Sequence, residues 1–461
     1  MISLGNVGEG FVRLTSDQVV ALAPDSGSAS NGKKLANTRH WKSLGQNDAA
    51  LWGECQGSGK DPYQVRVDLA TNEASCSCPS RKFPCKHGLG LMLLAISMPD
   101  AVPTSAAPDW VQSWLAKRAA NKAKQEAKQA APSDELMDEA TAAQRAKEQA
   151  KRIAQREAKV AKGLDRLDLW LTDLMRNGLE DAKEEPSSFW EGAAAQLVDS
   201  QAGTLANRVR QLASIPGSGA DWPERLLGGL GRVTLLTTAY RRADTLDPAL
   251  CNDVRQMIGW SLSAEEVAAH GERVTDEWLV LGQFTEEENY LRTQRVWLQG
   301  ANSHRNALIL QTGSIKTPFP EVFVAGDWFA GTLLFWPGAY PLRAKVERRD
   351  VASDRASALA GPETIEGFYG GMSDALARQP WLERFPCVLR NMTPVVVQKT
   401  RWLVRDTTGA TLPLRKGDFW RLLALSGGHP LTLACEWEDD ALAVMGAEIE
   451  GHYHPLGGMQ Q

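Results

Sequence analysis

Four side chains that can ligate a metal ion fall within twelve consecutive residues of this 461-residue chain: Cys76, Cys78, Cys85 and His87. Their spacing, C-x-C-x6-C-x-H, supplies three thiolates and one imidazole, which are donors that tetrahedral zinc prefers. A catalytic zinc site keeps one position open for water, whereas this set fills all four positions with protein. The sequence therefore predicts one structural Zn²⁺ bound by these four residues, in preference to a chance clustering of unrelated cysteines.

The residues around this cluster must position it. Residues 50–55 and 63–69 each show the period-two alternation of half-buried strands, and glycine, serine and proline between them supply a turn. A short apolar helix is predicted over 88–97, which places Cys85 and His87 at its N-terminal end, where the helix dipole favours a thiolate. The sequence thus predicts a ββα unit over about 50–98. Because its helix is apolar on nearly every face, we expect it to dock against another part of the chain.

The motif after two strands resembles the SWIM zinc finger, a module of bacterial proteins, chromatin-remodelling-type ATPases and transposases. The chain is also similar to a bacterial subgroup of standalone SWIM proteins in residues 52–59, 78–87, 198–202 and 340–344. Proteins of this subgroup are often encoded beside MoxR-type AAA+ ATPases and von Willebrand A domain proteins. The resemblance implies zinc binding, and an interaction with either nucleic acid or protein. The protein partner that it suggests is an AAA+ ATPase or a von Willebrand A domain protein.

Basic residues near the cluster have two interpretations. Arg81, Lys82 and Lys86 flank the ligands, and a second basic run without acids holds Lys33, Lys34, Arg39, His40 and Lys42. One interpretation is a surface that contacts the phosphates of DNA or RNA. The other is charge compensation, because three thiolates, a neutral imidazole and Zn²⁺ leave a net charge of −1. We favour compensation for the three flanking residues. Residues 1–98 have a net charge of +2 and the remainder −7, which permits a basic N-terminal face without requiring one.

Composition sets the class of protein. A hydrophobic content of 43% and a charged content of 23% are those of an ordinary soluble globular protein. No apolar run approaches the roughly 18 residues that a membrane span needs. We find no secretory signal pattern, and seven cysteines form an odd count spread over the whole chain. We therefore expect a cytoplasmic protein without disulfides or membrane contact.

The period of the apolar residues changes along the chain and predicts an α+β multidomain fold. Leu164, Leu167, Leu171 and Leu174 repeat at helical spacing, whereas the residues beyond 284 show short strand-like runs bounded by Gly, Pro and Asn. The predicted regions are an N-terminal region at 1–100 with the finger at about 50–98, an Ala/Lys/Glu-rich helical linker at 101–162, a helical domain at 163–284, and a mostly β domain at 285–461 with a helical insertion at 351–395.

No enzyme signature is present in the sequence. The patterns of a Walker A loop, a G-x-S-x-G elbow, an H-E-x-x-H metalloprotease and a dinucleotide fingerprint are all missing. His452 and His454 lie near Glu448 and Glu450, and could bind a second metal, although an exposed strand end is the preferred interpretation. We expect a non-enzymatic interaction or adaptor protein in a bacterial assembly. The alternative is a nucleic-acid-binding protein that uses the basic finger module, and a hydrolase hidden in the C-terminal domain is a weaker third hypothesis.

Overall fold

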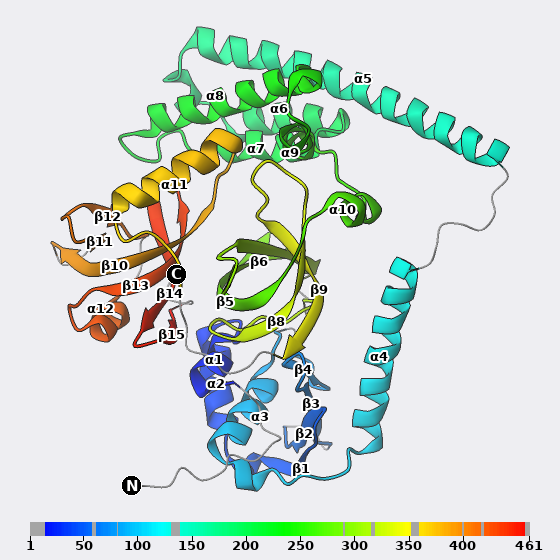
Figure 1. Cartoon of the computed structure of the whole chain (residues 1–461), viewed down its shortest axis with the longest axis vertical. Coiled ribbons are helices and arrows are strands. Elements are labelled where there is room, and N and C mark those ends of the chain that lie inside the picture. The colour runs from blue at the N-terminus through cyan, green and yellow to red at the C-terminus, as the bar shows by residue number, and fades with distance from the viewer. Residues whose placement is uncertain are drawn as a thin grey trace.

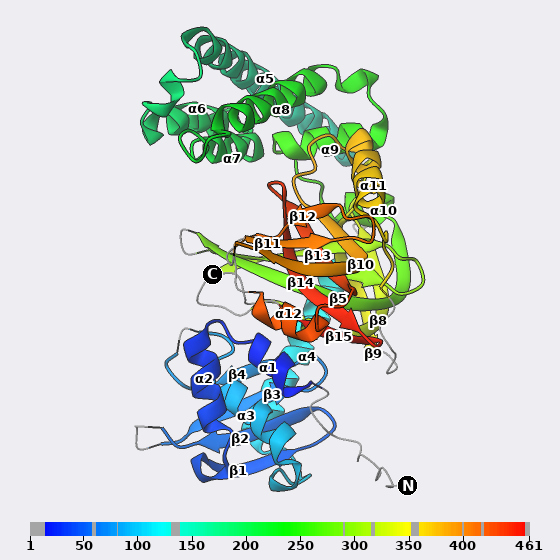
Figure 2. The same ribbon diagram turned by 90° about the vertical axis from the view of Figure 1, so that its left-hand side faces the viewer.

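The computed structural model describes residues 14–57, 61–80, 82–130, 139–288, 291–314, 319–351, 359–398, 401–415 and 419–456. Figure 1 shows four parts in chain order: a small α/β unit at one end, a long two-helix arm, a helical bundle at the opposite end, and β structure between the two ends. The 90° view in Figure 2 shows the same order along the long axis. None of the helices in the described part of the chain is long and apolar enough to cross a membrane.

The N-terminal unit is a four-stranded antiparallel sheet covered by three helices. The strand order is β1-β2-β3-β4, and the predicted strands at 50–55 and 63–69 correspond to β2 and β3. The outer strands β1 and β4 extend this pair, and β4 ends in the first predicted ligand, Cys76. The elements are α1 (Ser16–Ala21), α2 (Ser26–Leu35), β1 (Trp41–Gln46), β2 (Ala50–Cys55), β3 (Tyr63–Asp68), β4 (Glu73–Cys76) and α3 (Lys86–Ser97).

Helix α3 forms the centre of this unit. Leu89, Leu91 and Leu94 are fully buried, in a core that also contains Val19 of α1 and Val324 from the β structure that follows the bundle. Helix α2 approaches α3 closely through glycines: a Cβ on Gly90 would lie 2.7 Å from the Cβ of Leu35. The finger helix is therefore enclosed by its own sheet, by two added helices and by a distant part of the chain, as its apolar sequence led us to expect.

The arm consists of α4 (Asp109–Ala130) and α5 (Glu139–Asn177). The first turns of α4 are held on the outer face of the finger sheet, where the guanidinium of Arg66 stacks at 5.6 and 5.5 Å from the rings of Trp110 and Trp114. Arg118 extends this contact, because it forms ion pairs with Asp68 on β3 and Glu73 on β4. Helix α4 then rises along the side of the molecule and α5 returns to the bundle (Figure 1).

The bundle buries the predicted leucine stripe. Leu164, Leu167, Leu171 and Leu174 belong to its core. Helix α5 runs through residue 162 without interruption, so the predicted boundary between linker and helical domain falls inside one helix. The remaining helices are α6 (Ser187–Asp199), α7 (Gly203–Leu212), α8 (Trp222–Arg241), α9 (Pro248–Ile258) and α10 (Ala264–His270).

The β structure begins at Arg273, whereas the sequence predicted a helical domain to residue 284. The physical reason is burial on both faces of β5: Trp278 and Val280 enter one core, and Leu279 and Leu281 enter another. A strand buried on both faces shows no period-two alternation. The strand belongs to a closed barrel of order β5-β6-β7-β9-β8, formed by β5 (Arg273–Glu288), β6 (Leu291–Gly300), β7 (Asn306–Ser314), β8 (Trp328–Phe335) and β9 (Arg343–Val351).

A six-stranded sheet of order β12-β11-β10-β13-β14-β15 follows the barrel. The predicted helical insertion at 351–395 is present but much shorter, because α11 is its described helix and β10 already begins at Phe385. Strand β10 is also buried on both faces, with Leu389 in the sheet's own core and Val388 in the core shared with the barrel. The elements are α11 (Ile365–Arg378), β10 (Phe385–Val397), β11 (Arg401–Arg405), β12 (Thr411–Pro413), α12 (Trp420–Ser426), β13 (Leu431–Glu438), β14 (Ala441–Ile449) and β15 (His452–Pro455).

Apolar packing joins this sheet both to the barrel and to the bundle. Leu281 and Trp297 of the barrel pack with Val388 and Met445 of the sheet in one buried cluster. Trp381, in the connection between α11 and β10, inserts into the core of the helical bundle, and its indole Nε1 donates a hydrogen bond to the Arg232 carbonyl of α8 at 3.0 Å. The bundle, barrel and sheet therefore form one packed body.

Candidate metal centre

The structure brings all four predicted ligands together. Their ligand atoms lie within 4.8 Å of one another, and the Nδ1 atom of His87 is 3.8 Å from the Sγ of Cys76 and 3.9 Å from the Sγ of Cys85. Zinc–sulfur bonds of ~2.3 Å and zinc–nitrogen bonds of ~2.0–2.1 Å give a tetrahedron with edges of about 3.5–3.8 Å. The four donors thus surround a space of the size that one zinc ion requires.

The C-x-C half of the site is held by the strand ladder. Cys76 is the last residue of β4 and pairs in register with Val65 of β3. Ser77 keeps the chain against β3 beyond that point, because its N–H donates to the Gln64 carbonyl at 3.0 Å and its hydroxyl accepts from the Gln64 N–H at 2.9 Å. Residues two apart in extended chain share a face, so this contact directs Cys76 and Cys78 to the same side.

The C-x-H half of the site is held by the start of α3. Cys85 is the N-cap residue and His87 lies in the first turn, and both are buried. The side chain of Cys85 makes no capping hydrogen bond, so its sulfur is available to the metal, at the helix end whose dipole favours a thiolate. The ring of Tyr63 packs 5.1 Å from the ring of His87. A Cβ on Gly57 would lie 2.3 Å from the Tyr63 ring, so a glycine is needed for this packing.

The electrostatics of the cluster favour a bound cation. Hydrogen bonds from Cys78 and Cys85 raise the pKa of Cys76, whereas hydrogen bonds from Cys76 and Cys85 lower the pKa of Cys78. Burial lowers the pKa of His87, but its hydrogen bonds with Cys78 and Cys85 outweigh burial and raise this pKa to about 9. Three crowded sulfurs therefore cannot all ionise unless positive charge lies between them, and Zn²⁺ supplies that charge.

Cys55 does not belong to the cluster of four ligands. It is a buried residue of β2, and burial raises the pKa of its thiol to about 11. His452 and His454 lie on β15, and among the described residues the Cys76 cluster is the one group whose ligand atoms could hold a metal ion. With four protein donors and no open position, the arrangement is that of a structural site and not a catalytic one.

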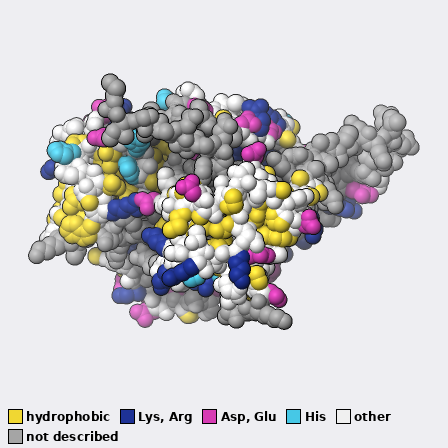
Figure 3. Space-filling model, turned by 90° about the horizontal axis from the view of Figure 1, so that it is seen from below, with side chains coloured by type: hydrophobic (Ala, Val, Ile, Leu, Met, Phe, Trp, Pro, Cys, Tyr) yellow, Lys and Arg dark blue, Asp and Glu magenta, His cyan; other side chains and the backbone are white. Residues whose placement is uncertain are grey.

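The predicted nucleic-acid contacts are only partly assembled. Lys82 forms an ion pair of 2.7 Å with Asp25, the N-cap residue of α2, and Arg81 lies outside the described residues. The Nε atom of Arg39 donates to Nε2 of His40 at 3.0 Å. The remaining cations are exposed at the end of α2, at the start of α3 and on β1: Lys33, Lys34, Lys86 and Lys42. Figure 3 views the molecule from the end where the finger unit lies. In this view the Lys and Arg side chains are scattered among hydrophobic and acidic ones and do not form one continuous patch.

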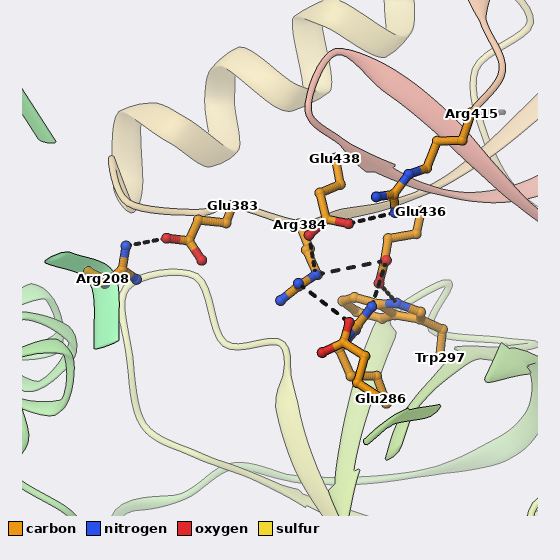
Figure 4. A network of polar contacts seen from close by, with 9 residues as sticks. Arg208, Glu286, Trp297, Glu383, Arg384, Arg415, Glu436 and Glu438 are labelled. Atoms are coloured by element: carbon orange, nitrogen blue, oxygen red, sulfur yellow. Dashed lines mark hydrogen bonds and ion pairs between the residues drawn. The ribbon is translucent and has the colours of Figure 1, made fainter. Parts of the chain in front are cut away.

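Sequence reasoning missed a second polar cluster, which lies between the barrel and the sheet (Figure 4). The fully buried Glu436 accepts a hydrogen bond from Nε1 of Trp297 at 2.6 Å and pairs with Arg295 at 3.3 Å. A charged residue inside an apolar strand, as in Leu431–Glu438, is the signal that could have revealed it. The other members of the network are Glu286, Arg384, Arg415 and Glu438. Three guanidinium groups face three carboxylates, so the network is balanced in charge and joins the two β units.

A cleft of ≈1570 Å³ lies beside this network. Its walls come from the finger unit, the barrel and the C-terminal sheet, through residues such as Asp25, Phe83, Arg292 and Arg415. Both acidic and basic side chains line it, so its charge does not select one class of ligand.

Comparison with known protein families agrees with the geometry at the metal centre. The family model of the SWIM zinc finger matches residues 63–96, which include the four ligands and most of α3. The family model of the SWIM-associated four-helix bundle domain matches residues 155–258, from the middle of α5 to the end of α9. No curated protein and no solved structure matches the chain.

Proposed function

We propose that this chain, a SWIM zinc finger protein with one structural zinc site, is a cytoplasmic, non-enzymatic adaptor in a bacterial assembly. The burial of α3 is the observation that supports this role. His87 in its first turn and the N-cap residue Cys85 face the metal site, and its apolar side chains pack with α1 and with Val324, next to the barrel. Zinc therefore secures the joint between the finger and the rest of the molecule, with apparent binding of ~10–16 kcal/mol in finger peptides.

Exposed apolar side chains on the bundle support a protein partner. Leu169 of α5 is 68% exposed, and Leu227 and Leu235 of α8 are 50% and 48% exposed. A contiguous apolar patch left in water marks a surface that another protein covers, and we propose that these three leucines contribute to such a patch. The resemblance to standalone SWIM proteins suggests a MoxR-type AAA+ ATPase or a von Willebrand A domain protein as that partner.

The test mixes the purified chain with the purified ATPase and with the von Willebrand A domain protein encoded in the same genome. Size-exclusion chromatography should show a stoichiometric complex with one of them, and Leu227→Asp with Leu235→Asp should abolish it. Leu310→Asp, a similar change at an exposed leucine of the barrel, is the matched control and should leave the complex intact. Failure of the intact chain to form a complex with either protein would argue against the adaptor role.

The alternative is nucleic-acid binding by the finger. The exposed positions of Lys33, Lys34 and Lys86 on neighbouring ends of α2 and α3 support it, whereas the ion pair between Lys82 and Asp25 removes one candidate contact. Binding of DNA or RNA that falls steeply with salt, and that is abolished in Lys33→Gln, Lys34→Gln, Lys86→Gln, would favour this alternative.

A further inference from the structure

We propose that the solvent-facing side of α5 between Lys147 and Arg166 binds the phosphate backbone of a nucleic acid. This surface lies outside the zinc finger, and the proposal goes beyond the adaptor role. Six exposed cations define it, and we call it the α5 basic face: Lys147, Lys151, Arg152, Lys159, Lys162 and Arg166.

Helix geometry gathers these residues on one side. The α5 side chains that enter the bundle core, from Val160 to Leu174, mark the opposite side of the helix. At 3.6 residues per turn, the six cations fall within an arc of about 140° that faces away from this stripe. At 1.5 Å per residue, they extend over roughly 28 Å of helix.

Neighbouring acids offset only part of the positive charge of this face. The carboxylates that border it are engaged elsewhere: Glu157 pairs with Arg255 at 3.3 Å, and Asp165 pairs with Arg241 at 3.1 Å. Glu148 lies among the cations, where it accepts a hydrogen bond from Gln144 at 3.2 Å. In the described part of the chain, none of the six cations forms an ion pair. The whole chain has a net charge of −5, so this face is opposite in sign to the molecule as a whole.

The composition of the face favours phosphate over a protein partner. Between the cations lie Ala, Gln and the single carboxylate of Glu148, and the face has no aromatic side chain. Protein interfaces draw most of their binding energy from buried aromatic and other large anchors, which this face does not offer. Phosphate contacts, in contrast, come from Lys, Arg and Gln side chains. A length of roughly 28 Å spans about eight phosphates of one strand of a duplex, at 3.4 Å per phosphate.

Two further features make the face accessible. Figure 1 shows the N-terminal half of α5 extending beyond the other helices of the bundle, and its described side chains from Lys147 to Gln155 are all exposed. The face presents no group arranged to read base edges. We therefore expect binding that is independent of sequence and strongly dependent on salt.

The test is fluorescence anisotropy of the full-length protein with a labelled 20-base-pair DNA duplex and a labelled single-stranded RNA, from 50 to 300 mM KCl. The variant Lys147→Gln, Lys151→Gln, Arg152→Gln, Lys159→Gln should bind at least tenfold more weakly at 50 mM. On duplex DNA, the slope of log affinity against log salt concentration should be less steep for this variant than for the wild type. The slope should decrease in magnitude by up to about 0.9 for each phosphate that the variant no longer neutralises. The matched control removes four charges from the finger, with Lys33→Gln, Lys34→Gln, Lys42→Gln and Lys86→Gln, and should bind like the wild type.

Two results would overturn the inference. Loss of binding in the finger variant, with full binding in the α5 variant, would place the phosphate-binding surface at the zinc finger. The absence of binding by the wild type to both probes at 50 mM KCl would exclude a phosphate-binding face. Gln has nearly the helix propensity of Lys, so circular dichroism and the zinc content should be unchanged in both variants. Because the adaptor proposal is tested by complex formation with a protein, failure of either proposal leaves the other standing.

Discussion

Glu436 and Trp297 belong to different β units, yet the buried Glu436 carboxylate on β13 accepts a 2.6 Å hydrogen bond from the Trp297 indole on β6. The same carboxylate pairs with Arg295, so one residue of the C-terminal sheet satisfies two donors of the barrel. A buried charge is tolerated only when its partners replace the water that it loses. This contact therefore fixes how the barrel and the sheet are joined.

We predict that Glu436→Gln destabilises the joined β units by about 2–4 kcal/mol, because it leaves the buried guanidinium of Arg295 with less compensation. Urea unfolding followed by tryptophan fluorescence measures the change. Glu347→Gln, which removes one half of the exposed ion pair with Arg273, is the control and should cost less than about 1 kcal/mol. Equal effects of the two variants would contradict a structural role for the buried network.

Removal of the metal should unfold the finger. Elemental analysis should find close to one zinc per chain, and Cys78→Ser should lose the zinc and expose the amides of residues 50–98 to hydrogen exchange, because the ion supplies much of the folding free energy of so small a unit. Cys55→Ser is the control and should keep its zinc. Full retention of metal by Cys78→Ser would show that the ligand set is wrong.

Close packing of α2 on α3 should depend on glycine at position 90. In Gly90→Ala the new Cβ would lie 2.7 Å from the Leu35 Cβ and 3.3 Å from the Gly32 carbonyl oxygen, so the two helices must separate. We expect the N-terminal unit to be destabilised by about 1–3 kcal/mol, as measured by thermal unfolding. Gly228→Ala is the matched control, because a Cβ there meets nothing within 4 Å, and it should stabilise α8 by up to about 1 kcal/mol. Stabilisation by both changes would contradict the observed packing.

Asp253 should make stability depend on pH. Burial raises the pKa of this α9 carboxyl from 3.8 to about 6, although its hydrogen bond from the Ala339 N–H opposes the shift. The folded state therefore binds more protons than the unfolded state between about pH 4 and 6, and this group's contribution to stability falls as pH rises through that window. The cost above pH 6 is on the order of 3 kcal/mol.

Asp253→Asn removes the ionisation and keeps an acceptor for the Ala339 N–H. It should flatten the pH dependence of the midpoint of urea unfolding between pH 4 and 7, with the largest stabilisation relative to wild type at pH 7. A parallel shift of the whole curve would show that another group titrates in this range.

Local sequence patterns are sufficient to predict the metal centre. Four donors within twelve residues, preceded by two alternating strands, predict the Cys76, Cys78, Cys85 and His87 site. The structure brings all four together, because residues so close in sequence need only a strand end and a helix start to meet. The leucine stripe of α5 is another such pattern, since a helical period is independent of what the helix packs on.

Other features of the fold depend on tertiary contacts that the local sequence does not reveal. Strands β5 and β10 are covered on both faces, so their sequences have no period-two alternation and do not predict strands. The partnership of Glu436 with Trp297 joins residues 139 positions apart, which no local pattern could predict. The sequence by itself determined which side chains could bind zinc; the fold alone decided that the finger helix is buried against the barrel and that six cations of α5 share one exposed face.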